Sequence, residues 1–355
     1  MKDLSQLLNI RFPIVQAPML GVTTPAMVAA VANAGGLGSL PIGGMSPDAS
    51  LALVNETRSL TDKPFAVNLF AHSINNNFSE NDIANMENYL EQIHRHYGIT
   101  FERMPRSAYK FYNHLDQIDL LLSEKVPIVS FTFGLPEADI IEKFRKQGIK
   151  TIGTATSVKE AKILDQAGLD AIVAQGIEAG GHRGSFLEDE HLPQLGLMSL
   201  VPQIVDVVSI PVIAAGGLFD QRTIKAAFAL GASGVQMGTY FIAAKESLAS
   251  EVYKDRLLAS VDTSTELTQA FTGKWARGIR NDFMEKMKTS GLTIPYFIYQ
   301  NSLTTALRTY GKSSGISDVM SLWAGQSASK SKRGSTEDLF LDLVDQIQKD
   351  QDPIF

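Results

Sequence analysis

The stretch AQGIEAGGHRGSF, residues 174–186, places a single histidine among four glycines. Histidine has an ordinary pKa of about 6.5 and can therefore take up a proton near neutral pH. Glycine loses more backbone freedom on folding than any other residue, so this many glycines indicate backbone that must approach something closely. The stretch predicts that His182 is a general base held over a ligand. The alternative is a histidine that bridges the long loop between Gly176 and Gly196.

Polar side chains and glycines also follow several short apolar segments, with almost no charge among them. Amide side chains donate and accept hydrogen bonds, which suits the heteroatom-rich edge of a ring system. Glycine N–H groups after the last two segments can approach phosphate oxygens. These residues are Asn68, Thr132, Thr154, Gln175, Gly216, Gly217, Gln236, Met237, Gly238 and Thr239. Together they predict a phosphorylated ligand with a large neutral polar ring, such as flavin mononucleotide (FMN).

Taken singly, each of these residues is better explained as a polar strand end or a tight turn, so the prediction rests on their agreement.

Two other residue patterns do not support a binding site. His94 and His96 lie two residues apart on a predicted helix and do not share a face, and the chain has no cysteine, so no metal site is predicted. GGLGSLPIGG lacks the third glycine of a dinucleotide fingerprint, because Pro41 stands in its place.

Eight short, almost wholly apolar segments must present these residues. Strands that do not alternate in polarity are buried on both faces, as in a parallel sheet covered by helices. They are predicted at residues 14–17, 37–40, 65–69, 127–133, 149–154, 170–175, 211–215 and 234–238. Eight strands separated by helices have the rhythm of a (β/α)8 TIM barrel, which gathers its chemistry at the strand carboxyl ends. An open, doubly wound sheet is the alternative fold.

The helices between these strands carry recognisable ends. Thr24 followed by Pro25 predicts a helix start, and Ser157 with Glu160 matches a capping box. Left-handed C-terminal caps are predicted at Gly35, Gly148, Gly168 and Gly231.

Two regions do not follow the barrel rhythm and predict a smaller, mostly helical second domain. The barrel is expected to comprise residues 1–71 and 111–240, interrupted by an insertion at 72–110. Residues 241–355 are expected to form a helical cap over one end of the barrel. Two helical stripes support this division, one of Ile83, Met86, Leu90 and Ile93, and one of Leu339, Phe340, Leu343, Val344 and Ile347.

The net charge and the lengths of the apolar runs restrict the function classes. The 355 residues carry a net charge of −6, which argues against a basic nucleic-acid footprint. No apolar run approaches the roughly 18 residues that a membrane span needs, and the N-terminus lacks a signal-peptide core. We therefore expect a cytoplasmic protein that acts on a small molecule and binds neither nucleic acid nor membrane. The sequence leaves open whether it forms a homo-oligomer.

Six motifs resemble those of the nitronate monooxygenases, formerly called 2-nitropropane dioxygenases. They are QAPM at 16–19, VNLF at 67–70, FTFG at 131–134, AQGIEAGGHRG at 174–184, IPVIAAGG at 210–217 and GVQMGT at 234–239. QN at 300–301 and LWAGQS at 322–327 also resemble that family. The combination of the histidine motif with GVQMGT makes the resemblance specific.

The resemblance implies a TIM barrel that binds FMN at the strand carboxyl ends. His182 matches the position of the family's catalytic base. The positions that match its FMN-binding residues are Asn68, Gln175, Gly180, Gly217, Gln236, Met237, Gly238 and Thr239. Family members oxidise alkyl nitronates with molecular oxygen to an aldehyde or oxo acid and nitrite. Propionate 3-nitronate, a natural toxin, is the implied substrate, and detoxification the implied role.

Two points stay open. His182 would stabilise the nitronate anion if protonated, or take the α-proton of a nitroalkane if neutral. The alternative function is that of an FMN-dependent NAD(P)H enoyl-ACP reductase of the same superfamily, which also has an EAGGH-like loop. A third hypothesis is a barrel that binds a phosphorylated ligand without catalysis. The presence of His182 at the predicted ligand position argues against it. The motifs FTFG and LWAGQS favour nitronate oxidation.

Overall fold

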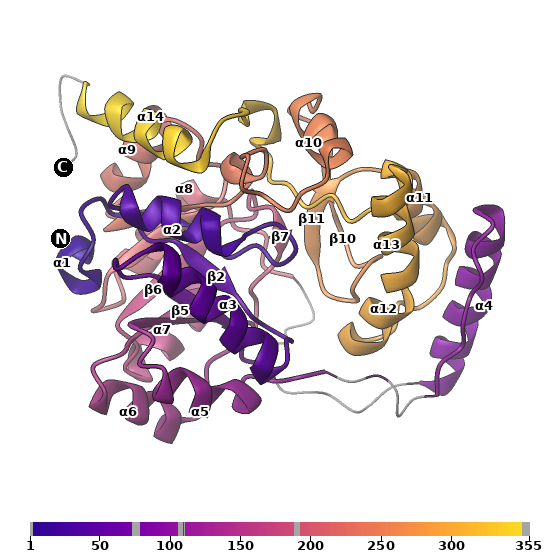
Figure 1. Cartoon of the computed structure of the whole chain (residues 1–355), viewed down its shortest axis with the longest axis horizontal. Helices are drawn as coiled ribbons and strands as arrows, with labels where there is room; N and C mark the ends of the chain where they lie inside the picture. The colour runs from indigo at the N-terminus through magenta and orange to yellow at the C-terminus, as the bar shows by residue number, and fades with distance from the viewer. Residues whose placement is uncertain (1–2, 73–78, 106–108, 110, 188–191, 350–355) are drawn as a thin grey trace.

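The computed structural model describes residues 3–72, 79–105, 109, 111–187 and 192–349. Parts of the predicted insertion lie outside these ranges. The chain forms a barrel of strands ringed by helices and a smaller unit beside it (Figure 1). None of the described helices combines the length and apolar character that a membrane span requires.

Eight parallel strands form the barrel. Their order is β1-β9-β8-β6-β5-β4-β3-β2, and a parallel bridge between Val15 and Leu37 joins β1 to the segment before β2. The strands are β1 (Ile14–Gln16), β2 (Ser39–Pro41), β3 (Ala66–Phe70), β4 (Ile128–Thr132), β5 (Lys150–Ala155), β6 (Ala171–Gln175), β8 (Val212–Ala215) and β9 (Gly234–Met237). Each overlaps a predicted segment. The predicted (β/α)8 TIM barrel is confirmed, and the open-sheet alternative is wrong.

Helices cover the outside of the barrel. They are α2 (Pro25–Asn33), α3 (Pro47–Leu60), α5 (Leu115–Ser123), α6 (Ala138–Lys146), α7 (Val158–Gln166), α8 (Leu197–Val205) and α9 (Gln221–Ala229), with α1 (Leu4–Leu8) before β1. Thr24 caps α2 by accepting a hydrogen bond from the N–H of Met27. The four predicted cap glycines all have positive φ angles: Gly35 at 98°, Gly148 at 74°, Gly168 at 80° and Gly231 at 96°. These local predictions are confirmed.

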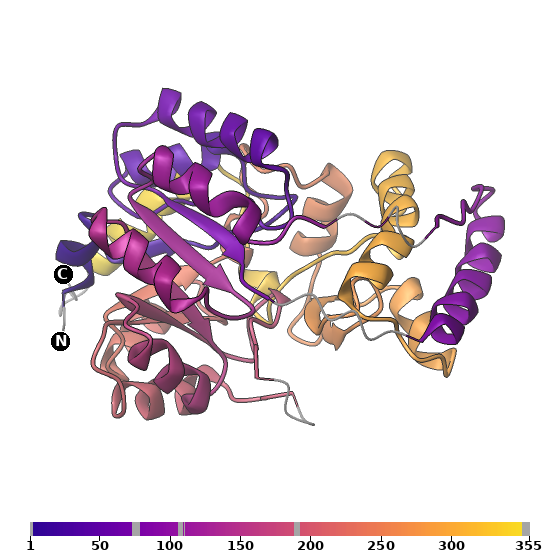
Figure 2. The ribbon, with the colours of Figure 1, turned by 90° about the horizontal axis from the view of Figure 1, so that it is seen from below.

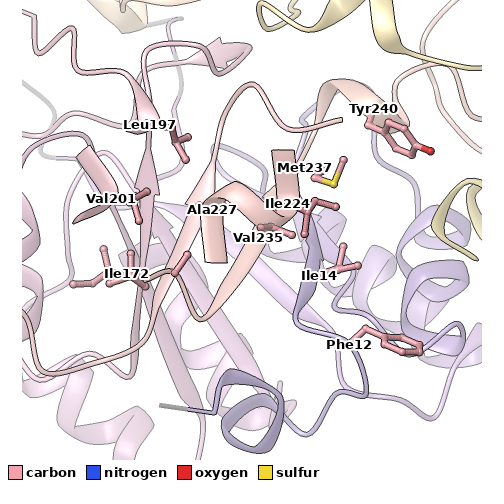
Figure 3. Close-up of a cluster of buried hydrophobic side chains, with 14 of the residues drawn as sticks. Phe12, Ile14, Ile172, Leu197, Val201, Ile224, Ala227, Val235, Met237 and Tyr240 are labelled. Carbon is pink, nitrogen blue, oxygen red and sulfur yellow. The ribbon is translucent and has the colours of Figure 1, made fainter. Parts of the chain in front are cut away.

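The strands have apolar side chains on both faces. Ile14 of β1 and Val235 of β9 point outward and pack with Ile224 of α9 in the main hydrophobic cluster (Figure 3). Val15, the next residue along β1, belongs instead to a cluster inside the barrel that α1 closes. Burial on both faces explains why the strand sequences do not alternate in polarity.

The last helix, α14 (Thr336–Gln348), lies elsewhere than the sequence analysis expected. It packs against α2 and α9 on the outer ring of the barrel and does not belong to a cap (Figure 1). The ring of Phe340 lies so close to Gly36 that a Cβ atom there would come within 2.4 Å of it. The segment after β9 forms only the short 3-10 helix η2 (Thr239–Phe241), so the apolar face of α14 fills the remaining place in the ring.

The smaller unit joins the insertion to the C-terminal region. It contains α4 (Glu80–His96), α10 (Glu251–Leu258), α11 (Asp282–Thr289), α12 (Phe297–Leu303), α13 (Thr305–Ser314) and the 3-10 helices η3 (Ser317–Val319) and η4 (Ala328–Lys330). Helix α4 lies at its outer edge (Figure 2). The predicted stripe of α4 is buried against Phe271 and Phe283 in one hydrophobic cluster. Two segments far apart in sequence therefore share a core.

A short antiparallel sheet connects this unit to the barrel. Strands β10 (Thr265–Thr268) and β11 (Ala276–Ile279) form a hairpin, and β11 also pairs with β7 (Gly181–His182). The sequence analysis expected only irregular and helical structure in this region. TELT and ARGI are too short to show an alternating pattern, and β11 also pairs with a strand almost a hundred residues away.

Candidate active site

A cavity of about 620 Å³ opens at the carboxyl ends of the barrel strands, between the barrel and the smaller unit. All the site residues expected from the sequence line it: Asn68, Gln175, Gly180, His182, Gly217, Gln236, Met237, Gly238 and Thr239. The fold thus brings these residues together, while the roles assigned to them remain predictions. Among the described residues, no cluster of three histidine, aspartate or glutamate side chains is arranged to hold a metal ion.

The backbone of His182 is fixed by the smaller unit. His182 is paired with Ala276 in the short sheet, and the N–H of the next residue, Arg183, donates to the carbonyl of Trp275 at 2.8 Å. Pairing with β11 orients the whole segment that the sequence analysis treated as a loop. The candidate base is therefore held from outside the barrel.

His182 is half-buried, and its ring lies among aromatic side chains. Its centroid lies 5.7 Å from that of Phe133, 6.1 Å from Phe297 and 5.5 Å from Trp323. Burial, with smaller contributions from the cations of Lys274 and Arg308, lowers the pKa of His182 to about 3. The imidazole is therefore neutral at neutral pH, and its Nε2 lies 2.8 Å from Oγ1 of Thr272.

Two side chains tie the histidine segment to the end of β6. Gln175 donates through Nε2 to the carbonyl of His182 at 3.0 Å and accepts from the N–H of Gly184 at 2.8 Å. The guanidinium of buried Arg183 donates to the carbonyls of Gln175 and Gly176. Arg183 therefore holds the histidine segment against the end of β6. Gln175 keeps one N–H and one lone pair for a ligand, since an amide has two of each.

Asn68 presents an acceptor atom at the cavity. Its side chain is 3 % exposed, and Nδ2 donates to Oγ of Ser130 at 3.0 Å and to Oγ1 of Thr132 at 3.1 Å. No donor from the described residues reaches its Oδ1. Oδ1 can therefore accept from a ring N–H of a ligand in the cavity.

The strand ends β8 and β9 form a cradle suited to phosphate. Gly216 and Gly217 have φ angles of 122° and 70°, which only glycine adopts without strain. Within the described ranges, the N–H groups of Gly217 and Gly238 donate to no backbone carbonyl. Ser327 of the C-terminal region donates to the carbonyl of Gly217 at 2.7 Å and fixes this turn. Free N–H groups beside a glycine turn match the chemistry of a phosphate ester.

Comparison with known proteins identifies the family of this chain. The family model described as "Nitronate monooxygenase" matches residues 1–346. The chain belongs to the nitronate monooxygenase family. A probable nitronate monooxygenase of Staphylococcus aureus (strain JH9) is 43 % identical over 347 residues, which cover 98 % of this chain and 97 % of the relative. The family is one of oxidoreductases, so the assignment as an oxidoreductase follows from it.

Two solved structures of similar shape support the assignment. A nitroalkane oxidase from Streptomyces ansochromogenes superimposes with a TM-score of 0.90 at 34 % identity and covers 98 % of both chains. FabK from Thermotoga maritima has a TM-score of 0.74 at 30 % identity and covers 97 % of this chain and 95 % of its own. Fold and sequence therefore lie nearer to the nitroalkane oxidase than to FabK.

The glycines of the nitronate monooxygenase motif meet protein backbone as well as the cavity. A Cβ atom at Gly180 would lie 2.4 Å from the backbone nitrogen of Gly325, and one at Gly184 would lie 2.6 Å from the side chain of Thr154. Gly180 and Gly325 belong to two motifs quoted from the sequence, AQGIEAGGHRG and LWAGQS. The sequence analysis explained these glycines by close approach to a ligand. Gly180 also leaves room for the backbone of Gly325 in the same polypeptide.

Cationic side chains at the cavity were missed by the sequence analysis. Arg308 and Lys312 lie four residues apart on α13 and both line the cavity. Arg308 donates through Nη2 to the carbonyl and Oδ1 of Asn301 and through Nε to Oγ1 of Thr304. Its Nη1 has no hydrogen-bond partner among the described residues. Burial lowers the pKa of Arg308 to about 10, so the guanidinium stays charged at neutral pH.

Glu160 supports the segment after His182. Its buried carboxylate accepts from the N–H groups of Phe186 at 2.7 Å and Thr156 at 2.6 Å. Ser157 caps α7 as predicted, accepting from the N–H of Glu160 at 3.2 Å. The predicted capping box is only half formed, because the carboxylate of Glu160 bonds Thr156 and the histidine segment. This carboxylate therefore connects α7 to the candidate active site.

Replacing His72 by leucine is expected to stabilise the protein at acidic pH. His72 is 5 % exposed, and its ring nitrogens have no hydrogen-bond partner among the described residues. Burial first, then the charges of Lys274 and His114, lowers its pKa from 6.5 to about 4. The unfolded chain thus binds more protons between pH 4 and 6.5, and this residue's contribution to stability falls as the pH drops through that window.

The expected gain of the His72→Leu variant is about 2 kcal/mol at pH 5 relative to its effect at pH 8. Urea unfolding at the two pH values measures it. An identical change in the free energy of unfolding at pH 5 and pH 8 would show that His72 keeps its ordinary pKa in the folded protein.

Proposed function

We propose that this protein oxidises alkyl nitronates with molecular oxygen, using FMN, to an aldehyde or oxo acid and nitrite. One observation carries the proposal: the neutral His182 lies in the cavity, and the charged groups of the described residues that act on it are two cations, Lys274 and Arg308. A pocket with positive charges nearby favours an anionic ligand, and an alkyl nitronate is an anion. Nitronate and oxygen would be its small-molecule partners, and detoxification its role.

FMN fits the residues that line the cavity. Asn68 and Gln175 would bind the polar edge of its ring, and Gly217 and the segment 236–239 would bind its phosphate. Gly180 would let the backbone lie near the ring. When bound, FMN supplies the electron acceptor that none of the protein's side chains can provide. Mass spectrometry of the cofactor released on denaturation distinguishes FMN from other flavins.

The neutral state of His182 selects between its two expected roles. With a pKa of about 3 it carries no charge at neutral pH, so stabilisation of the nitronate by a protonated His182 is not expected. The neutral ring is the correct form for taking the α-proton from a nitroalkane, which breaks the C–H bond and leaves the electron pair in the nitronate. The cations nearby lower the cost of that new negative charge.

Arg308 favours a substrate with a second anionic group. Its free Nη1 and the neighbouring Lys312, which also lines the cavity, would donate hydrogen bonds to a carboxylate of the substrate. Charge-assisted hydrogen bonds of a guanidinium to a carboxylate are about twice as strong as neutral ones. Propionate 3-nitronate carries both a nitronate and a carboxylate, so we propose it as the preferred type of substrate.

A direct assay tests the proposed function. The purified protein, loaded with FMN, is mixed in air with propionate 3-nitronate, and nitrite release and oxygen uptake are followed together. The proposal predicts both, with no oxidation of added NADPH. Oxidation of NADPH with an enoyl thioester, and no nitrite from the nitronate, would instead indicate the reductase alternative.

A further inference from the structure

We propose that Thr272 is a positioning residue that holds His182 in the tautomer with its proton on Nε2, leaving Nδ1 for the substrate. The inference rests on the proposed function, because it refines how His182 would act there. Thr272 lies between β10 and β11, outside every motif that the sequence analysis singled out. It is not a catalytic residue, since it acts only through the histidine.

Among the described residues, the ring of His182 has one hydrogen-bond partner. Its Nε2 lies 2.8 Å from Oγ1 of Thr272, and the rings of Phe133, Phe297 and Trp323 surround the rest. Within the described part of the chain, Nδ1 has no hydrogen-bond partner. The nitrogen bound to Thr272 is therefore occupied, and Nδ1 is the nitrogen left for a substrate.

Counting donors and acceptors at the hydroxyl decides between the two neutral tautomers. A threonine hydroxyl donates one hydrogen bond and accepts two. The N–H of Lys274 lies 3.4 Å from Oγ1 as a donor, and the carbonyl of Lys274 lies 3.4 Å away as an acceptor. A proton on Nε2 fills the remaining acceptor position. A proton on Nδ1 would turn the hydroxyl toward Nε2, away from the carbonyl, and leave one acceptor position of Oγ1 unused.

The turn around Thr272 fixes the position of the hydroxyl oxygen, so only the hydroxyl proton can reorient between the two tautomers. Thr272 is 3 % exposed, and the next residue, Gly273, has a φ angle of 80°. A Cβ atom at Gly273 would come within 2.4 Å of the carbonyl oxygen of Pro295, so this turn is pressed against the segment before α12. The N–H of Gly273 also donates to the carbonyl of Gln269 at 2.8 Å. These contacts of the turn fix the position of Oγ1 of Thr272.

The arrangement has a chemical consequence. When Nδ1 takes the α-proton from a nitroalkane, the C–H bond breaks, an N–H bond forms, and the electron pair stays on the nitronate. The ring then carries a positive charge, and its Nε2–H is already directed at Oγ1 of Thr272. Holding the tautomer beforehand spares the reaction a reorganisation of the ring.

Nitrogen NMR of the full-length protein labelled with 15N-histidine tests the proposal without substrate. The signal of His182 is identified by its loss in His182→Asn, and its shifts at pH 7 report which nitrogen is protonated. We expect the Nε2–H tautomer in the parent and in Thr272→Ser, and a mixture in Thr272→Val. Thr268→Val is the matched control, because the hydroxyl of this buried hairpin threonine accepts from the N–H of Ala270 at 3.0 Å and, among the described residues, does not contact His182. It should keep the parent tautomer.

Kinetics provide the second readout. Thr272→Val should lower the ratio of nitroalkane to nitronate turnover about tenfold, the worth of one hydrogen bond, and Thr272→Ser should restore most of it. An Nδ1–H tautomer in the parent, or an unchanged tautomer in Thr272→Val, would overturn the proposal. Failure of the parent to release nitrite from a nitronate would contradict the proposed function instead, and the NMR result would still stand.

Discussion

Replacing His182 by asparagine is expected to abolish the turnover of neutral nitroalkanes. A positioned general base contributes about 10²- to 10⁴-fold to a proton transfer, and asparagine cannot take up the proton. Nitronates are already deprotonated, so their oxidation should be retained in part. FMN should remain bound, because the predicted cofactor contacts of Asn68, Gly217 and the segment 236–239 are untouched. Nitrite release from paired nitroalkane and nitronate substrates measures the difference.

Two features make this comparison informative. Asparagine keeps a polar side chain of smaller volume at this position, so the site should fold as in the parent. The visible spectrum of the bound cofactor reports directly whether the variant is loaded. Equal loss of both activities with FMN retained would argue that His182 binds the substrate and does not abstract a proton.

Replacing Arg308 by methionine is expected to raise the KM for propionate 3-nitronate by about 10- to 100-fold. Hydrogen bonds to charged groups contribute about 1.5–3 kcal/mol, and this variant removes them together with the cation. The kcat should change less than the KM, since the carboxylate takes no part in the bond changes at the reacting carbon. A nitronate without a carboxylate, such as that of nitropropane, should show a much smaller change in KM.

Two control variants separate recognition of the carboxylate from other effects. Arg308→Lys keeps the charge but loses the planar fork, so its KM should lie between those of the parent and Arg308→Met. Arg280→Met removes an exposed arginine of the same unit, which donates to the carbonyl of Thr263 at 3.0 Å, and should leave both substrates unaffected. Equal increases of KM for nitronates with and without a carboxylate would contradict the assignment of Arg308.

The barrel could be predicted because its signals are local. A buried parallel strand needs an apolar run, and a helix followed by a strand needs a residue that tolerates a left-handed cap, as Gly148 and Gly231 do. The site could be predicted in part for the same reason. Once the strands are assigned, the topology forces their carboxyl ends together, and Asn68, Gln175 and Gly217 must then share one cavity.

The rest of the site depends on contacts between distant segments. His182 and Thr272 are 90 residues apart, and neither residue's neighbours indicate that they meet. From the sequence alone, Arg308 is an ordinary charged residue of an amphipathic helix, because only the fold shows that this helix lies beside the cavity. Glu160 matched a local capping pattern, yet its carboxylate serves the segment after His182. Helix α14 was misplaced because periodicity marks an apolar face without naming the surface that covers it.

The visible spectrum of the FMN-loaded protein tests the central claim most directly. The protein is mixed without oxygen with propionate 3-nitronate and, separately, with NADPH. The account predicts that the nitronate changes the flavin absorbance within seconds and that NADPH leaves it unchanged. Bleaching by NADPH with no response to the nitronate would contradict the account and favour a reductase.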